Sequence, residues 1–232
     1  MDFSKLSTYN DFANAHFYIV GRLGHLRDTL PYPDHDVRHV MLGGIQRIVA
    51  GYGMGLNSMI FNRSQEQVIE SLGESNQPPD ELRKAVEDAW RWGISILFHF
   101  RIDSLFSSLL YAARQTPSPQ FRQKAEALVR FAALASPDAQ IGRLLALSYI
   151  RNSFHNNGIH QNAPLQIELG GTWFNFVRNE PVQCASWAHM FVVMDAVADV
   201  LSDLLHSNAV SELPQPIPDA YAEALRAGRI DD

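Results

Sequence analysis

The chain is nearly free of cysteine, since Cys184 is the single one among 232 residues. An intramolecular disulfide is therefore excluded, and so is a metal centre built from several thiolates of one chain. Cys184 stands just before an expected helix start, a position that lowers the pKa of a thiol. A lone thiol beside Trp187 is nevertheless more often a packing residue than a nucleophile.

Positive charge is also scarce, because 19 Lys and Arg residues stand against 25 Asp and Glu residues and leave a net charge of −6. Diffuse attraction to nucleic-acid phosphates requires a cationic surface, so this composition excludes a general polyanion binder. Any contact with nucleic acid has to come from a local group of arginine or lysine side chains. Hydrophobic residues make up 46% of the chain, which is typical of a globular protein with a packed core.

Long hydrophobic runs are missing as well. The most apolar run, residues 191–201, is interrupted by Asp195 and Asp199 and is too short to cross a bilayer. The first residues, MDFSKLSTYNDF, contain no apolar segment of the kind found in signal peptides. We therefore expect a cytoplasmic protein that does not enter a membrane.

Apolar residues recur three and four positions apart over most of the chain, which predicts amphipathic helices. The second helix is expected to end near Val49, where three glycines alternate in GYGMG and lower the helical propensity. The third is apolar over most of its circumference, Leu97 and Phe100 included, which is typical of a central helix in a bundle. The expected helices span about 12–26, 37–49, 80–114, 120–135, 138–156 and 186–206.

One segment breaks the helical pattern. In LQIELGGTWFNFV, apolar residues alternate on both sides of Gly170 and Gly171, which predicts a β-hairpin at about 164–178 with a two-residue turn. The predicted fold is therefore all-α, a helical bundle with one β-hairpin inserted before its last helix.

We expect a single domain over residues 1–232. Its parts are an N-terminal helical region (1–62), a bundle core (78–207) and a Pro-rich tail (211–232) that is loose or draped over the surface.

Polar side chains replace the apolar stripe at the end of the helix over 138–156, in the stretch SYIRNSFHNNGIH. The face of Leu144 and Leu145 continues into Arg151, Asn152 and His155. Arg151 and His155 are four residues apart, so their side chains can approach one another. A guanidinium offers a fixed fork of donors to a phosphate, and an imidazole readily gives and takes a proton near neutral pH. The pair predicts a site that cleaves a phosphodiester without a metal.

A structural interpretation of the same stretch stays open. Gly158 is a natural helix stop, and polar residues at a helix C-terminus often serve only to bond the last carbonyl groups. Arg151 could equally form an ion pair with a carboxylate of a neighbouring helix.

The stretch YIRNSFHNNG resembles the signature of HEPN domains, a family of helical-bundle nucleotide-binding and RNase-type proteins. That signature is an arginine, a polar residue directly after it, often asparagine, and a histidine near the end of a late helix of the bundle. Arg151 and Asn152 match the first two positions. Three residues separate Arg151 from His155 and eight separate it from His160, and the spacing in the family lies between the two.

The resemblance implies a metal-independent endoribonuclease of toxin or defence type that works as a homodimer without a cofactor. Arg151 would stabilise the charge that develops on the phosphate, His155 would act as general acid or base, and Asn152 would orient one of them. RNA or a nucleotide would be the ligand, and an antitoxin a further partner. Two alternatives stay open: a non-catalytic HEPN-like dimeric scaffold or nucleotide-binding module, and a small-molecule or metal-binding bundle.

Arg101 is a second unusual residue, because it lies within the apolar stripe of the long helix. It is a further cation for RNA beside Arg151, the partner of Asp103, Asp195 or Asp199 in an ion pair, or a long side chain that reaches water. The connection to the hairpin can also fold a histidine back toward the motif. The expected binding residues are Arg101, Asn156 and His160.

Overall fold

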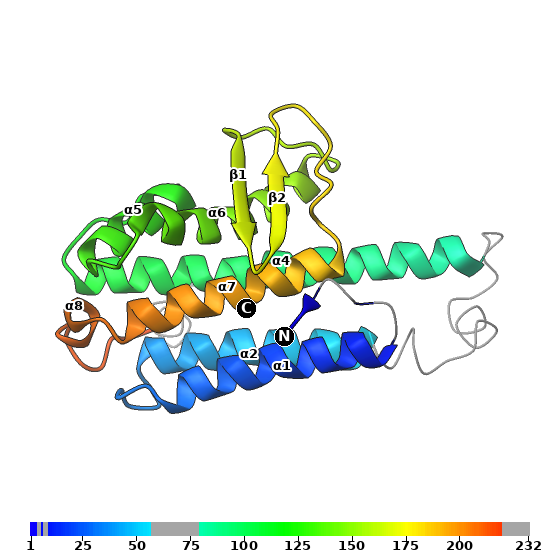
Figure 1. Cartoon of the computed structure of the whole chain (residues 1–232). Coiled ribbons are helices and arrows are strands. Elements are labelled where there is room, and N and C mark those ends of the chain that lie inside the picture. The colour runs from blue at the N-terminus through cyan, green and yellow to red at the C-terminus, as the bar shows by residue number, and fades with distance from the viewer. Residues whose placement is uncertain (4–5, 7–8, 57–78, 220–232) are drawn as a thin grey trace, which may run out of the picture.

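Helices account for most of the residues described in the computed structural model, which covers residues 1–3, 6, 9–56 and 79–219. The predicted all-α bundle with one inserted hairpin is confirmed (Figure 1). Residues 57–62 of the expected N-terminal region and the tail beyond residue 219 lie outside the described residues. The elements are α1 (Tyr9–Asp28), α2 (Val37–Leu56), α4 (Pro79–Ala112), α5 (Phe121–Phe131), α6 (Pro137–His155), β1 (Leu165–Leu169), β2 (Thr172–Phe176), α7 (Trp187–Leu205) and α8 (Asn208–Ser211).

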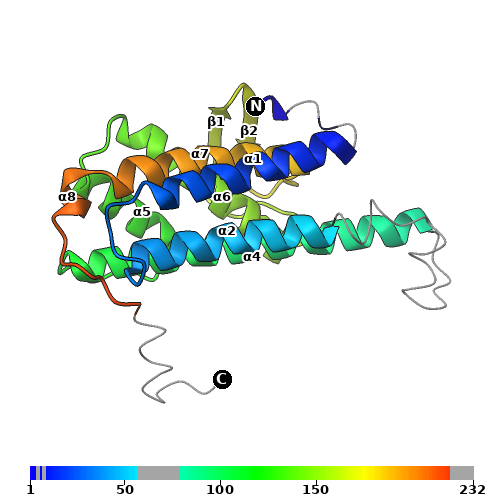
Figure 2. The ribbon, with the colours of Figure 1, turned by 90° about the horizontal axis from the view of Figure 1, so that it is seen from below.

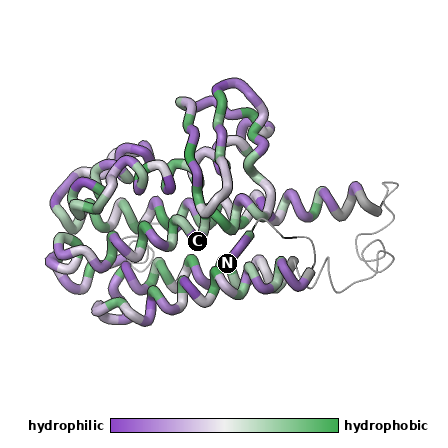
Figure 3. The backbone as a smooth tube through the Cα atoms, in the orientation of Figure 1, coloured by the Kyte–Doolittle hydropathy of each residue, from purple (hydrophilic) through white to green (hydrophobic). Residues whose placement is uncertain are grey.

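Helices α4 and α7 lie in the middle of the bundle, and the other long helices pack on two opposite sides of them. On one side, α1 and α2 pack against each other, α2 lies along α4, and α1 lies along α7 (Figures 1 and 2). On the other side, α6 contacts α4, α5 and α7, and the hairpin stands on α6 and α7. One connected cluster of buried apolar residues runs through all of these helices. The first turns of α4 extend beyond the other helices and are mostly hydrophilic (Figure 3).

The β-hairpin turns where the paired glycines predict it. Gly170 and Gly171 have φ angles of +53° and +78°, the left-handed region that favours glycine, and Leu169 pairs with Thr172 across the turn. Phe174 and Leu169 of the hairpin are buried against the helices. The hairpin contacts both α6 and α7, and Phe176 of β2 packs edge-on against Tyr149 of α6, two residues before Arg151, with ring centroids 5.4 Å apart.

The expected end of α2 near Val49 is wrong, because the helix continues through all three glycines of GYGMG. A methyl group on Gly53 would overlap the imidazole of His16 from α1. One on Gly55 would overlap the indole of Trp90 from α4. Rings of two neighbouring helices thus lie directly against the α2 backbone, and this packing outweighs the low helical propensity of glycine.

The long helix α4 is more exposed than its composition predicts. Leu97 and Phe100 are 40% and 60% exposed, so this part of the apolar surface does not face the core. By length and composition, the segment Lys84–Ala112 could also cross a membrane, but 50% of its most apolar window is buried in the bundle. Packing against α2, α5 and α6 explains why a helix of this composition is found here.

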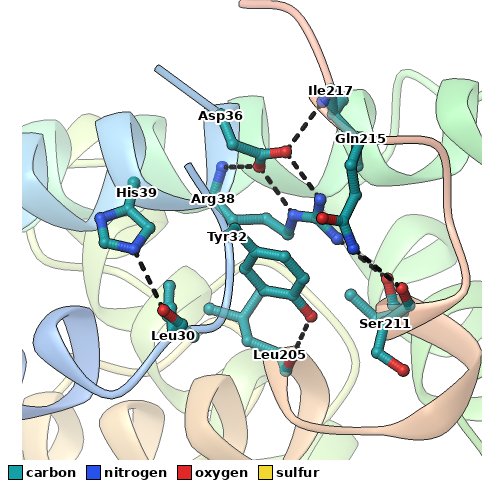
Figure 4. Close-up of polar contacts among 10 residues, drawn as sticks. Leu30, Tyr32, Asp36, Arg38, His39, Leu205, Ser211, Gln215 and Ile217 are labelled. Atoms are coloured by element: carbon teal, nitrogen blue, oxygen red, sulfur yellow. Dashed lines mark hydrogen bonds and ion pairs between the residues drawn. The ribbon is translucent and has the colours of Figure 1, made fainter. Parts of the chain in front are cut away.

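A fully buried ion pair joins the start of α2 to the chain after α8 (Figure 4). Asp36 and Arg38 have no exposed side-chain surface, and Arg38 donates from Nε and Nη2 to the two carboxylate oxygens at 2.7 and 2.6 Å. The Ile217 backbone N–H donates to Asp36 at 2.8 Å, and Arg38 also donates to the Val210 carbonyl at 3.0 Å. The guanidinium carbon lies 3.3 Å from the ring centroid of Tyr32. The described part of the tail is therefore anchored rather than loose.

Asp36 also caps α2, because its carboxylate accepts the backbone N–H of Arg38 at 2.9 Å. Burial raises the pKa of Asp36, but hydrogen bonds from the Arg38 side chain and from the Ile217 and Arg38 backbones outweigh burial and hold the pKa below its usual value. The carboxylate is therefore charged at neutral pH. The stability that comes from its lowered pKa is present above the ordinary aspartate pKa and is lost as the pH falls through the folded value.

Replacing Gly53 with alanine is expected to lower the free energy of unfolding by about 1–3 kcal/mol, because the added methyl group displaces the His16 ring. Gly51 is the matched control: it lies in the same helix, is exposed, and has open space where a Cβ would stand. Gly51→Ala should raise stability by about 0.5–1 kcal/mol through helical propensity alone. Chemical denaturation of both variants measures the difference, and equal effects would contradict the ring packing.

Asp36→Ala is expected to lower the free energy of unfolding by about 3–5 kcal/mol, because it leaves the buried Arg38 charge without its partner. Asp28→Ala removes a carboxylate from the exposed pair with Arg27, and should cost less than about 1 kcal/mol. Urea denaturation of the two variants at neutral pH provides the comparison. A cost for Asp36→Ala as small as that for Asp28→Ala would show that the pair does not anchor the fold.

Candidate functional site

Helix α6 ends within the polar motif for a local reason. The Gly158 backbone N–H donates to the Ser153 carbonyl at 2.7 Å, and Gly158 has a φ angle of +82°. This is the closing geometry that glycine favours after a helix. The prediction that Gly158 stops the helix is confirmed, since α6 ends at His155.

Arg151 lies half-buried in the last turns of α6, where the buried face of the helix turns polar. Its Nη1 donates to the Asn152 Oδ1 at 2.8 Å, so the side-chain amide of Asn152 orients one end of the guanidinium. Its Nε is buried and has no hydrogen-bond partner. Among the residues that the structure describes, no carboxylate forms an ion pair with Arg151. The structural interpretation of Arg151 as one half of an ion pair is therefore wrong within this part of the chain.

A cavity of about 530 Å³ opens beside Arg151, where α4, α5 and α6 meet. Its volume is within the range of small-ligand sites in proteins. The loop that leads to the hairpin closes one side with Asn162 and Ala163. The lining side chains that matter for its chemistry are His99 and Phe100 from α4, Phe121 and Arg122 from α5, and Arg151 and Asn152 from α6.

His99 is the residue of this site that the sequence did not reveal. It is 6% exposed, its ring centroid lies 4.3 Å from that of Phe121, and its Nε2 has no hydrogen-bond partner in the described structure. Burial, followed by the charges of Arg151 and Lys124, lowers the pKa of His99 to about 3. Its imidazole is therefore neutral at pH 7. The only signal in the sequence is a polar residue inside an apolar helix, one turn before Asp103.

The cavity's carboxylate, Asp103, is already paired with a lysine. The Nζ of Lys124 on α5 lies 2.7 and 2.8 Å from the two oxygens of Asp103, and it also donates to the Ser107 hydroxyl at 3.0 Å. Lys124 is almost completely buried, so this pair balances its charge. Among the described residues, the charge of Arg151 has no carboxylate partner.

The predicted histidines do not line the cavity. His155 is exposed at the last position of α6, and Asn156 closes the helix with its backbone. His160 is buried, its Nε2 lies 3.0 Å from the Ala163 carbonyl oxygen, and its ring packs 4.7 Å from that of Tyr149. Of the predicted site residues, the structure brings only Arg151 and Asn152 into the cavity.

Arg101 faces away from this site. It lies against α2, with its Nη1 3.9 Å from the Met41 sulfur. Its guanidinium also packs beside Gly44, where a Cβ would lie 3.5 Å from Arg101 Nε. The alternative of an ion pair with Asp103, Asp195 or Asp199 is wrong, because each of these carboxylates has another partner. Asp195 and Asp199 both bind Arg22, and Asp103 binds Lys124.

Two further expectations concern metal and thiol chemistry. Within the described ranges, no three His, Cys, Asp or Glu side chains come together in a group that could hold a metal ion. Cys184 is buried between the hairpin and α7, and burial raises the pKa of its thiol. The expectation that a helix start would lower this pKa is wrong, and the packing role fits the burial.

Comparisons of the chain with protein-family models, curated proteins and solved structures gave no match. The chemistry of the site is therefore inferred from its geometry. Within the part of the chain that the structure describes, the cavity presents one guanidinium without a counter-ion, a neutral imidazole whose Nε2 has no hydrogen-bond partner, and an amide that accepts a hydrogen bond from the guanidinium. Such a set of groups is suited to an anionic ligand with several acceptor oxygens.

Replacing Arg151 with methionine is expected to raise the pKa of His99, because it removes one of the two cations that oppose protonation. The new value should stay below the ordinary 6.5, since burial is the larger cause of the shift. Histidine Cε1–H signals followed by NMR against pH measure this change. Arg130→Met, which removes an exposed cation from α5, should leave His99 unaffected, and an unchanged His99 in Arg151→Met would contradict the proximity of the two groups.

Proposed function

We propose that the chain is a HEPN-like endoribonuclease that cleaves RNA without a metal and holds the scissile phosphate at Arg151. The observation that carries the proposal is the half-buried guanidinium of Arg151, which lines the cavity and has no carboxylate partner among the described residues. A partly buried cation without a counter-ion is costly. A phosphate relieves that cost, since its oxygens match the donor fork of arginine.

The proposed reaction is attack of an RNA 2′-hydroxyl on the adjacent phosphorus. The bond from O2′ to phosphorus forms, the bond from phosphorus to O5′ breaks, and the products are a 2′,3′-cyclic phosphate and a free 5′-hydroxyl. Arg151 stabilises the negative charge that builds on the phosphoryl oxygens. Asn152 supports this role by accepting a hydrogen bond from the guanidinium at 2.8 Å and so orienting it.

The proton in this reaction is assigned to His155. Its imidazole is exposed at the end of α6, one helical turn beyond Arg151 on the same side of the helix. It removes the proton of the 2′-hydroxyl or delivers one to the leaving 5′-oxygen, and solvent water supplies or accepts the other proton.

The proposed active form is a homodimer in the cytoplasm. Leu97, Phe100 and Tyr111 are exposed apolar residues along α4, and Phe100 is also part of the cavity lining. An apolar surface of this kind favours association with a second copy. The toxin or defence setting, with an antitoxin as partner, rests on the sequence resemblance alone.

The second candidate function is a nucleotide-binding module or scaffold that does not cleave RNA. The observation in its favour is that the imidazole inside the cavity belongs to His99, whose pKa of about 3 makes it a weak base at neutral pH. The exposed His155 lies outside the cavity lining. In this case Arg151 binds a phosphate, and no side chain in the cavity removes the 2′-hydroxyl proton.

Purified protein is expected to cleave single-stranded RNA in the presence of a metal chelator. Arg151→Ala should lower the cleavage rate by about 100- to 1000-fold, because it removes charge stabilisation from the transition state. His155→Ala should lower the rate by about 100-fold or more through loss of general acid–base catalysis. Gel analysis of 5′-labelled RNA, with cyclic phosphate ends identified by mass spectrometry, provides the measurement.

Arg130→Ala is the matched control, since it removes an exposed guanidinium from α5 outside the cavity. Its cleavage rate and melting temperature should equal those of the unchanged protein. If chelated protein binds RNA but leaves it intact, the binding module is the correct function. If Arg151→Ala unfolds the protein, Arg151 is a structural residue and the nuclease proposal is wrong.

A further inference from the structure

Two buried nitrogen atoms without a hydrogen-bond partner belong to side chains that line the same cavity from different helices. They are Nε2 of His99 on α4 and Nε of Arg151 on α6. Within the described structure neither has an acceptor or donor to bond with. Buried polar atoms in folded proteins nearly always have such a partner. The two atoms therefore mark where the polar groups of a ligand would bind.

The charged groups around His99 come from all three helices of the cavity. Asp103 is on α4, Lys124 on α5 and Arg151 on α6, and Lys124 is ion-paired with Asp103. The surroundings of the imidazole thus hold two cations and one carboxylate. The other titratable groups that line the cavity are Tyr149 and Arg122.

We propose that this cavity binds one phosphodiester of an RNA chain between Arg151 and His99, and that His99 takes up a proton as the phosphate binds. The inference rests on the phosphate site of the proposed function. It adds a binding residue from α4, His99, and the uptake of one proton by that residue, which RNA cleavage by itself does not require.

The proton uptake follows from how the ligand changes the surroundings of His99. Without an anion, burial and then the charges of Arg151 and Lys124 hold the pKa of His99 near 3, so the imidazole is neutral. A bound phosphate opposes both cations and offers an acceptor to a protonated Nε2, and both effects raise the pKa. Arg151 Nε can only donate, so it also requires an acceptor oxygen.

A neutral ligand or an ordered water could bond the same two nitrogens without changing the charge of His99. Proton uptake therefore separates a phosphate site from a merely polar cavity. The sign of the pH dependence is defined, since the protonated form of His99 belongs to the complex. Affinity should rise as the pH falls, approaching about tenfold per pH unit below the pKa of His99 in the complex.

The probe is the deoxydinucleotide dTpT. It has no 2′-hydroxyl and is not cleaved, and neither its phosphodiester nor its thymines titrate between about pH 5 and about pH 8. Phe100 and Phe121 line the cavity and supply aromatic faces on which its bases can stack. Calorimetric titration in two phosphate-free buffers of different ionisation enthalpy gives both the affinity and the number of protons taken up.

The unchanged protein is expected to bind dTpT more tightly as the pH falls from about 8 to about 5, with uptake rising toward about one proton per ligand. His99→Gln keeps an amide donor near the position of Nε2 but cannot be protonated, so its affinity should be nearly independent of pH. His25→Gln makes the same change on the exposed face of α1 and should behave like the unchanged protein. Arg151→Met should lose dTpT binding.

The inference is overturned if His99→Gln keeps the pH dependence of the unchanged protein, or if dTpT does not bind at all. Should His99→Gln fail to fold, the His99 signal of the unchanged protein decides by NMR. It should titrate at a higher pH when dTpT is saturating than in the free protein, and equal titration overturns the inference. Proton-linked dTpT binding by a protein that leaves RNA intact would refute the nuclease function alone, whereas cleavage without proton-linked binding would refute this inference alone.

Discussion

The buried ion pair of Asp36 and Arg38 fixes where the start of α2 meets the chain that follows α8 (Figure 4). A buried pair contributes little net stability by itself, because removing two charges from water costs about as much as their attraction returns. The pair instead fixes one arrangement of the segments it joins, since both oxygens of Asp36 accept hydrogen bonds and Arg38 also donates to the Val210 carbonyl. The start of α2 is thereby joined to the chain around α8. The α1–α2 pair contacts α7 through α1, and α7 packs on α6, which carries the candidate site.

Two arginines in this acidic protein show how structure and function place different demands on a buried charge. Arg38 is wholly enclosed and bonded to protein groups, so it is a structural residue. Arg151 is half-buried and lines a cavity; among the described residues it donates only to the neighbouring Asn152 amide, and its Nε has no hydrogen-bond partner. Arg101 also lacks an ion pair among the described residues, but it lies against α2 and not in the cavity. The combination of partial burial, a free donor and an adjacent cavity is what distinguishes a binding group from a packed one.

Most elements of the fold could be predicted, because their signals are local. Apolar spacing located the six long helices, and Gly170–Gly171 located the hairpin turn. The continuation of α2 through Gly53 and Gly55 could not be predicted, because the low helical propensity of glycine indicates a helix end there. These positions need glycine because the rings of His16 and Trp90, from other helices, lie against the α2 backbone. The exposure of Phe100 was equally hidden, since composition does not say which side of an apolar helix has a neighbour.

The sequence by itself determined the period of the helices, the adjacency of Arg151 and Asn152, and the polar end of α6. These follow from spacing within one segment and from the stop at Gly158. Only the tertiary structure decided that His99 from a distant helix lines the same cavity as Arg151, that Lys124 forms an ion pair with Asp103, and that His155 is exposed to solvent. The physical reason is that ion pairing and burial depend on which helix faces contact each other, and those contacts are set by the packing of the whole bundle.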